Sequence, residues 1–375
     1  MKILVSAGEA SGDRYAAELV QALRGRLNGA EFFGCAGARL REAGVRPVVR
    51  AESLAVVGIV EVLSHLPRIW AEYRRLLAAA LDERPSFAIL TDSPDFHLRL
   101  APRLHRARIP VVYLVAPQAW AWRRRRVHAM RRSLAHLLCI FPFEETFFRQ
   151  FGIPATYIGH PLAGRVSSTL SRDEFFRKHR LAPDRPLIAV LPGSRRGEAA
   201  RHLPALLQAM RQLNVWRAMN FVLPASNTTG RAFFVEPTAG SGVKLVEGET
   251  WDALAHADLA LVASGTATVE AALLGTPMVT FYRVHPVSWM LGRRLVQAPH
   301  LSMVNLLAGR RVVPELMQGD CTGPRLADEA RALLEDPARL AAMRADLAAL
   351  KDQLDAGRGA IDRAAGIIES FARSL

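Results

Sequence analysis

Short apolar runs recur along the first third of the chain and are separated by segments with helical spacing. Phe87–Leu90 and Val111–Val115 show no alternation of apolar and polar residues, which is typical of parallel strands that are covered on both faces. Tyr15–Leu27 instead places apolar residues at the spacing of one buried helical stripe. Strand-like runs that alternate with helices predict an α/β fold with a doubly wound sheet.

The same alternation restarts in the second half of the chain. Strand-like runs resume at Leu187–Leu191, after a polar stretch that follows Gly159-His160-Pro161. A length of 375 residues fits two domains at about 150 residues each. The segment from Arg325 onward is rich in Ala, Leu and Arg and is expected to be helical. Two similar α/β halves with a helical tail favour a two-lobed enzyme whose active site lies between the lobes.

The charge balance predicts an anionic partner. The chain has 49 Lys and Arg against 35 Asp and Glu, a net charge of +14. Eleven arginines and only two acidic residues lie between His97 and Arg149. Such an excess fits nucleic acid, an anionic membrane or phosphorylated substrates.

Composition also excludes several classes of protein. No uncharged apolar run approaches the roughly 20 residues of a bilayer-spanning helix. The N-terminal residues run into a polar Gly-rich segment and do not resemble a secretory signal. The cysteines (Cys35, Cys139 and Cys321) are far apart, which argues against a disulfide framework or a Cys-based zinc site and suits a reducing cytosol.

Two motifs follow strand-like runs in the first half. Ser6–Asp13 (SAGEASGD) stands where α/β sheets bind ligands, and its acidic residues suit sugar hydroxyls better than a pyrophosphate. The alternative is a turn in which Ser11 or Asp13 caps the next helix. Thr91–Phe96 (TDSPDF) places Asp92 first after a strand, where it could act as a general base. Asp95 ranks below it as a candidate, because helix caps often contain Asp.

Two further motifs lie in the second half. In Leu191–Glu198 (LPGSRRGE), the glycines allow close backbone approach, and Ser194 and Arg195 add donors that could clamp a nucleotide diphosphate. In Ala263–Glu270 (ASGTATVE), Gly265 and Thr266 could hold phosphate and Glu270 could bind ribose hydroxyls. A plain turn in the first segment, and stabilisation of the helix dipole by Glu270 in the second, are the alternatives.

Aromatic, basic and apolar residues mark two candidate surfaces. Trp120–Arg126 (WAWRRRR) joins tryptophans to four consecutive arginines, which suits either stacking on bases or a membrane interface. Leu54–Leu63 is strongly apolar, and helical spacing continues through Leu66, Ile69 and Trp70. Such a stripe fits acyl-chain or membrane contact, with burial in the core as the alternative.

Taken in order along the chain, these segments resemble the lipid-A-disaccharide synthase family, which makes the lipid A of bacterial outer membranes. The resemblance covers nearly the whole sequence. Its segments are SAGEASGD, LAVVGIVEVL, TDSPDF, APQAWAWRRRRV, IGHPL, LPGSR, ASGTATVEAALLGTPMV and VNLLAGRRVVPEL. The sequence departs from the family pattern at His97, where Asn is common, and at Val304, where Pro is frequent.

The resemblance implies a GT-B fold with two Rossmann-like doubly wound domains. The first would cover residues 1–163 and face the acceptor and the membrane, and helices at about 345–375 would pack back to complete it. The second would cover residues 164–344 and bind the UDP-sugar. The enzyme would transfer 2,3-diacylglucosamine from its UDP derivative to the 6-hydroxyl of 2,3-diacylglucosamine 1-phosphate. The expected product is a β-1,6 disaccharide, formed with inversion and with neither a metal ion nor a cofactor.

Site residues carry over from the family motif by motif. Asp92 would be the base for the acceptor hydroxyl, and Arg195 would neutralise the departing UDP. The two lobes would close during the cycle to bring these groups together. The sugar-binding residues would be Glu9, Ser11, Gly12 and Asp13. The nucleotide-binding residues would be Gly193, Ser194, Gly265, Thr266, Glu270 and Asn305. The membrane or acyl contacts would be Val56, Val57, Ile59, Val60, Leu63, Leu66, Ile69 and Trp70.

The expected location is the cytoplasmic face of the inner membrane, as a peripheral protein on an anionic surface. The expected partners are the UDP-sugar and the acylated sugar phosphate, and a homodimer is left open. The alternatives are another GT-B enzyme on UDP-sugars, such as a UDP-N-acetylglucosamine epimerase or the peptidoglycan N-acetylglucosaminyltransferase, and a nucleic-acid-binding protein. No RNA- or DNA-binding module is present, so no nucleic-acid partner is expected.

Overall fold

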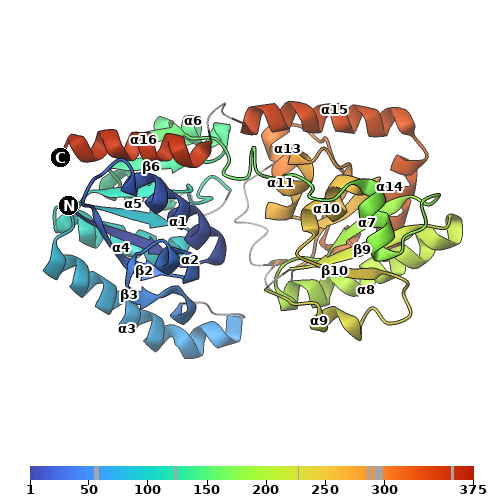
Figure 1. Cartoon of the computed structure of the whole chain (residues 1–375), viewed down its shortest axis with the longest axis horizontal. Coiled ribbons are helices and arrows are strands. Elements are labelled where there is room, and N and C mark those ends of the chain that lie inside the picture. Colours follow the sequence, from blue (N-terminus) through green and yellow to red (C-terminus); the bar gives the residue numbers. More distant parts are fainter. Residues whose placement is uncertain (55–58, 122–124, 227, 285–288, 291–298, 356–358) are drawn as a thin grey trace. The chain divides into compact units, whose positions relative to one another are not determined.

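The computed structural model divides the chain into two compact units (Figure 1). Unit 1 contains Met1–Pro161 and Leu354–Leu375, and unit 2 contains Leu162–Gln353. Each unit has its own parallel sheet. The structure describes residues 1–54, 59–121, 125–226, 228–284, 289–290, 299–355 and 359–375.

Unit 1 is built on a seven-stranded sheet in the order β3-β2-β1-β4-β5-β6-β7. The central strands are buried along almost their whole length, as expected when helices cover both faces of a sheet. The strand order reverses between β1 and β4, and such a switch point is where open α/β sheets bind ligands. The strands are β1 (Lys2–Ala7), β2 (Glu31–Ala36), β3 (Arg46–Arg50), β4 (Phe87–Thr91), β5 (Val111–Leu114), β6 (His136–Cys139) and β7 (Ala155–Tyr157).

The helices of unit 1 carry the buried stripes that the apolar spacing predicts. In α1, the side chains of Leu19, Val20 and Leu23 are fully buried, because these positions share the face that packs inward. The helices are α1 (Ala10–Arg24), α2 (Ala38–Glu42), α3 (Ile59–Glu83), α4 (Pro94–Arg106), α5 (Arg125–Ser133), α6 (Pro142–Gln150) and α16 (Ala360–Arg373), with a 3-10 turn at Ala51–Ser53.

The C-terminal helix α16 packs on unit 1. Arg26, just after α1, forms ion pairs with Asp362 at 2.6 Å and Glu369 at 3.1 Å. The ring of Phe371 meets the ring of Phe87 edge to face, with centroids 5.8 Å apart. The last helix of the sequence therefore completes the first unit.

Unit 2 is built on a six-stranded sheet in the order β10-β9-β8-β11-β12-β13, which reverses between β8 and β11. Its apolar core joins the central strands to α8 and α14. The strands are β8 (Leu187–Leu191), β9 (Asn220–Ala225), β10 (Lys244–Glu247), β11 (Leu259–Ala263), β12 (Met278–Tyr282) and β13 (Glu315–Met317). The helices are α7 (Arg172–His179), α8 (Arg196–Trp216), α9 (Ala232–Val235), α10 (Thr250–His256), α11 (Thr266–Leu273), α13 (Met303–Ala308), α14 (Gly323–Leu334) and α15 (Pro337–Leu354), with a 3-10 turn at Gln318–Asp320.

The predicted fold class of two doubly wound sheets is confirmed. The edge strands β3, β7 and β13 cannot be recognised from the sequence pattern, because strands of three to five residues at an edge are too short or too polar to leave a signal. It also placed the start of the first helix too late. Since α1 begins at Ala10, Ser11 and Asp13 lie inside the helix, and the alternative interpretation, in which either residue caps its start, is wrong.

Candidate active site

Two of the predicted motifs meet at the switch point of unit 1. Asp92, directly after β4, accepts hydrogen bonds from two backbone N–H groups that follow β1. Gly8 donates to Oδ1 at 2.8 Å and Glu9 donates to Oδ2 at 3.1 Å. The two loops come from positions 84 residues apart in the sequence, and the sheet order alone makes them neighbours. The carboxylate is therefore oriented by the protein itself.

Close approach explains two glycines beside this carboxylate. A Cβ atom on Gly12 would lie 1.6 Å from Asp92 Oδ2, and one on Gly8 would lie 2.3 Å from Ser93 Oγ. Neither glycine has a positive φ, so glycine is required at these positions for its lack of a side chain and not for its conformational freedom. Because these two glycines have no side chain, the β1–α1 turn can lie against the loop after β4.

The surroundings of Asp92 raise its affinity for a proton. Burial raises the pKa of this carboxyl to about 7, against the opposing effect of the Gly8 and Glu9 N–H groups, and the charge of Glu9 raises it further. The side chain nevertheless remains partly exposed. A partly exposed carboxylate with a pKa near neutrality is suited to accept a proton from a substrate.

The other predicted residues of this turn divide into two groups. Glu9 and Ser11 are exposed. Asp13 is only 5% exposed, and its carboxylate accepts hydrogen bonds from the N–H groups of Gly37, Arg39 and Leu40 at 2.7, 2.8 and 3.3 Å. Asp13 thus holds the start of α2 and satisfies N–H groups that a short helix leaves open.

In unit 2, the loops after β8 and β11 flank the second switch point. Gly193 has a φ of +116°, which favours glycine, and it turns the chain toward α8. The carbonyl of Ser194 accepts hydrogen bonds from the hydroxyls of Thr229 at 2.7 Å and Ser226 at 3.2 Å. Arg195 is exposed and precedes the first turn of α8. The hydroxyls of Ser226 and Thr229 therefore hold this loop in place, while the side chain of Arg195 is exposed to solvent.

The loop after β11 is open in the same way. Gly265 and Thr266 are exposed at the start of α11, where backbone N–H groups without helical partners favour an anion. Glu270 is partly buried, and its Oε1 accepts a hydrogen bond from Trp251 Nε1 at 3.2 Å. The exposed donors of this loop and of the Ser194 loop follow neighbouring strands, as a phosphate-binding site requires.

Asn305 is fully occupied inside the protein. Its side chain is completely buried. Its Nδ2 donates to the carbonyl of Val313 at 2.9 Å and to Glu315 at 2.7 Å, and its Oδ1 accepts from the N–H groups of Val312 and Val313 at 2.7 and 2.9 Å. These bonds use all four positions of the amide, so Asn305 shapes the chain between α13 and β13.

Two buried polar side chains near these loops carried no signal in the sequence. His202 donates from Nδ1 to the carbonyl of Pro192 at 2.8 Å, and its Nε2 accepts from the N–H of Arg283 at 2.9 Å. It therefore links the ends of β8 and β12. The hydroxyl of Tyr113 donates to the carbonyl of Asp92. A lone histidine in a helix and a tyrosine in a strand have no distinctive spacing, so only the tertiary contacts reveal them.

The structure corrects part of the predicted aromatic and basic surface. Trp120 is 8% exposed, and its indole N–H donates to the buried Glu144 at 3.0 Å. It packs in the core because this bond satisfies its one polar atom. Burial raises the pKa of Glu144 to about 8. Arg126 pairs with Asp95, and residues 122–124 lie outside the described residues.

The predicted apolar stripe lies on α3 where it is described. Leu66 and Trp70 are 47% and 54% exposed, and Ile69 is partly buried. Val56 and Val57 lie outside the described residues, as do the side chains of Ile59, Val60 and Leu63. Within the described ranges, no helix is both long and apolar enough to cross a bilayer. Large exposed apolar side chains close together on one helix are typical of a contact surface.

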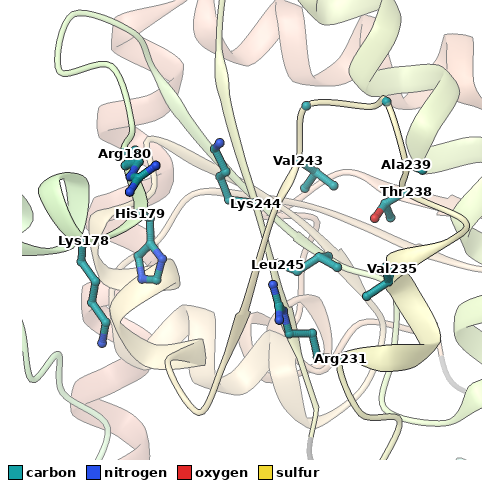
Figure 2. Close-up of a pocket in the computed structure, with 12 residues that line it drawn as sticks. Lys178, His179, Arg180, Arg231, Val235, Thr238, Ala239, Val243, Lys244 and Leu245 are labelled. Carbon is teal, nitrogen blue, oxygen red and sulfur yellow. The ribbon is translucent and has the colours of Figure 1, made fainter.

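A basic hollow of about 460 Å³ lies elsewhere in unit 2 (Figure 2). Glu249 accepts from Lys178 at 3.0 Å and from His179 at 2.8 Å. Lys178 lies in the last turn of α7, where the helix dipole stabilises a cation. Lys244 lies on the edge strand β10, where a lysine disfavours pairing with another strand. None of the predicted site residues lines this hollow. Its basic lining residues are Lys178, His179, Arg180, Arg231 and Lys244.

Among the residues that the structure describes, no group of three or more His, Cys, Asp or Glu side chains is placed to hold a metal ion.

Comparison with known proteins matches both the sequence and the fold. The family model described as lipid-A-disaccharide synthetase matches residues 3–362. The lipid-A-disaccharide synthase of Solibacter usitatus is 65% identical over 346 residues, covering 92% of this chain and 91% of that protein. The one of Myxococcus xanthus is 45% identical over 333 residues, covering 88% and 87%. The structure of a UDP-GlcNAc 2-epimerase from Neisseria meningitidis bound to UDP-GlcNAc has a TM-score of 0.66 at 13% identity, with all of both chains covered. The last likeness concerns the fold alone.

Proposed function

The chain belongs to the lipid-A-disaccharide synthase family, and we propose that Asp92 and Arg195 are the catalytic residues of its glycosyl transfer. The enzyme is a glycosyltransferase that uses a UDP-sugar. The proposed donor is UDP-2,3-diacylglucosamine, and the proposed acceptor is 2,3-diacylglucosamine 1-phosphate. The new bond joins the acceptor 6-oxygen to the anomeric carbon, and the bond from that carbon to UDP breaks. The products are the β-1,6 disaccharide 1-phosphate and UDP.

Asp92 is proposed as the general base, and its anchored, partly exposed carboxylate is the observation that carries the proposal. Inversion by one in-line displacement needs a group that takes the proton of the 6-hydroxyl as the oxygen attacks. By analogy with inverting hydrolases, the transition state has oxocarbenium character. A pKa of about 7 lets Asp92 be ionised before attack and hold the proton after it.

Arg195 is proposed to stabilise the negative charge that develops on UDP. Its guanidinium is exposed at a loop that Ser226 and Thr229 hold in place. A guanidinium binds phosphate oxygens through paired N–H groups. The open loops at Gly193, Ser194, Gly265 and Thr266 would supply further donors to the diphosphate, and Glu270, held by Trp251, would accept from the ribose hydroxyls.

The proposed roles of four predicted residues follow from their exposure and hydrogen bonds. Glu9 and Ser11 are exposed and are proposed to contact the sugar. Asp13 is proposed to act indirectly, because its carboxylate already binds three backbone N–H groups of the α2 region. Asn305 is likewise proposed to shape the chain beside the nucleotide site, because its amide has no remaining donor or acceptor.

Unit 1 is proposed to receive the acceptor and to contact an anionic membrane surface at the cytoplasmic face of the inner membrane. Leu66 and Trp70 present exposed apolar surface on α3, and Arg68, Arg74 and Arg75 on the same helix are exposed. Apolar and basic side chains on one helix bind at the boundary of anionic lipid headgroups. Unit 2 is proposed to bind the UDP-sugar.

The direct test supplies the purified enzyme with UDP-diacylglucosamine and the acylated sugar 1-phosphate in mixed micelles. Disaccharide and UDP are expected in equal amounts by mass spectrometry, and release of UDP without disaccharide would overturn the proposal. Asp92→Asn is expected to abolish turnover while UDP affinity stays largely intact, and Arg195→Ala is expected to weaken both. Asp95→Asn is the matched control, because Asp95 is exposed and pairs with Arg126.

A further inference from the structure

The main chain at the proposed base adopts a conformation that side chains rarely tolerate. Asp92 has a φ of +53° and Ser93 a φ of +39°. Both lie in the left-handed region, where the Cβ of an L-residue crowds the backbone. Two such residues in succession persist only where the surrounding structure holds them. The direction of the Asp92 carboxylate depends on this backbone conformation, because φ and ψ of Asp92 set the direction of its Cα–Cβ bond.

Two side-chain donors meet on the carbonyl oxygen of Asp92. Tyr113 donates its hydroxyl at 2.5 Å and His97 approaches with Nδ1 at 2.9 Å. Tyr113 comes from β5 and His97 from α4, and both side chains are completely buried. A carbonyl has two acceptor positions, so these bonds fill both and leave the peptide no freedom to rotate without losing one.

The protonation of His97 follows from its partners. A carbonyl only accepts, so Nδ1 carries the proton. Burial lowers the pKa of His97 to about 4, so the ring is neutral and Nε2 is an acceptor. Ser6 Oγ lies 2.7 Å from Nε2, and its hydroxyl therefore donates to the ring. Ser6 belongs to β1, so one chain of hydrogen bonds ties β1 through α4 to the end of β4.

We propose that Tyr113 and His97 are positioning residues for the glycosyl transfer, which hold the Asp92 peptide so that its carboxylate points away from the core. This inference rests on the proposed role of Asp92 as the base. Neither side chain touches the reacting atoms. They act through the Asp92 carbonyl, whereas the N–H groups of Gly8 and Glu9 hold its carboxylate.

The chemistry of position 97 indicates which substitutions it should tolerate. The side-chain amide of asparagine carries an N–H donor, as the Nδ1–H of His97 does. What histidine and asparagine share is a donor on the first turn of α4, one turn after Asp92. The position is therefore expected to tolerate either residue and to reject an apolar one of similar size.

The test removes single donors and measures kcat and KM separately. Tyr113→Phe deletes only the hydroxyl, and kcat is expected to fall about tenfold or more, since small misplacements of a catalytic group are costly. KM for the UDP-sugar is expected to stay unchanged. Tyr73→Phe is the matched control, because its hydroxyl donates to a backbone carbonyl of the same unit, that of Arg99, at 3.1 Å. His97→Asn is expected to keep kcat within about threefold, whereas His97→Leu is expected to lose it as Tyr113→Phe does.

A double variant separates this inference from the role of Asp92 itself. In an Asp92→Asn background, Tyr113→Phe is expected to cause no further loss of the residual turnover that is measured at high enzyme concentration, because there is no base left to position. The inference is overturned if Tyr113→Phe and Tyr73→Phe have the same kcat while Asp92→Asn is inactive, or if His97→Asn and His97→Leu lose activity equally. An active Asp92→Asn enzyme would instead refute the proposed base. The melting temperature of each variant shows whether it still folds. If Tyr113→Phe or His97→Leu fails to fold, the kcat of His97→Asn relative to the unmodified enzyme tests the inference instead.

Discussion

Replacing Gly12 by alanine would place a methyl group where the carboxylate of Asp92 now lies. The added Cβ would be 1.6 Å from Oδ2 and 2.5 Å from Cγ of Asp92. Ordinary van der Waals contact begins near 3.4 Å, so the methyl carbon and the oxygen must separate by about 1.8 Å. The helix backbone can move little, because it is packed on the sheet. The carboxylate is therefore expected to leave its bonds with Gly8 and Glu9.

The size of the effect follows from this displacement. Moving a catalytic group by about 1 Å costs roughly a hundredfold in rate, which corresponds to about 2.7 kcal/mol in the barrier. Stability is expected to fall by about 1–3 kcal/mol, because a methyl group is inserted into a packed site, and the preference of alanine over glycine in a helix offsets about 1 kcal/mol of this. Gly12→Ala should thus reduce kcat at least a hundredfold in an enzyme that still folds, with a modestly lower melting temperature.

Initial rates of UDP release, with the disaccharide measured in parallel, give kcat and KM for this variant. Gly25→Ala at the end of the same helix is the control, because its Cβ would approach only the carbonyl of Ala22, at 3.7 Å. Its kinetics should match those of the unmodified enzyme. If Gly12→Ala keeps kcat within twofold of that control, the position of the Asp92 carboxylate does not limit the reaction and the reasoning is refuted.

Three further predictions concern pH, packing and membrane contact. Because burial raises the pKa of Asp92 to about 7, kcat/KM should fall about tenfold per pH unit below that value, and a kcat/KM that stays constant between about pH 5 and 7 would contradict this. The same raised pKa makes stability from this group complete below its unfolded pKa of about 4 and lost as pH rises through 7, so Asp92→Asn should raise the melting temperature more at pH 8 than at pH 5. Asn305→Ala should cost about 3 kcal/mol of unfolding free energy in denaturant titration, because it leaves buried backbone groups unpaired, whereas the exposed Asn214→Ala should cost little. Leu66→Ser with Trp70→Ser should reduce binding to phosphatidylglycerol vesicles without lowering the melting temperature, and Leu81→Ser, equally exposed on α3, should not; a collapsed melting temperature would return the stripe to the core.

Local patterns were sufficient to predict the class of fold and the position of the site loops. Buried parallel strands must be apolar throughout, so Phe87–Leu90 and Leu187–Leu191 are recognisable without any neighbour. Ligand loops of such sheets follow the strands directly. Asp92 and Arg195 could therefore be singled out as candidates from their place after a strand, and their catalytic roles stay proposals.

The part that the sequence left open depends on contacts between distant segments. Asp13 and Glu9 belong to the same short sequence motif, yet the carboxylate of Asp13 binds the N–H groups of Gly37 and Leu40. The side-chain amide of Asn305 is hydrogen-bonded to residues that a turn brings back to it. Trp120 precedes a run of arginines in the sequence, but its indole N–H donates to Glu144, 24 residues further on, and the side chain is buried. No local spacing records such pairings.

The amino-acid sequence by itself determined the two α/β halves, the position of the four loops that are proposed to bind ligands, and the family, because each of these depends on short runs of neighbouring residues. Tertiary structure alone decided that β1 lies beside β4 and β8 beside β11, and hence which loops meet. It also decided that the peptide of Asp92 is held in a left-handed conformation by Tyr113 and His97. Hydrogen bonds to a single carbonyl require positions in space, and strand order, which no local pattern encodes, supplies those positions.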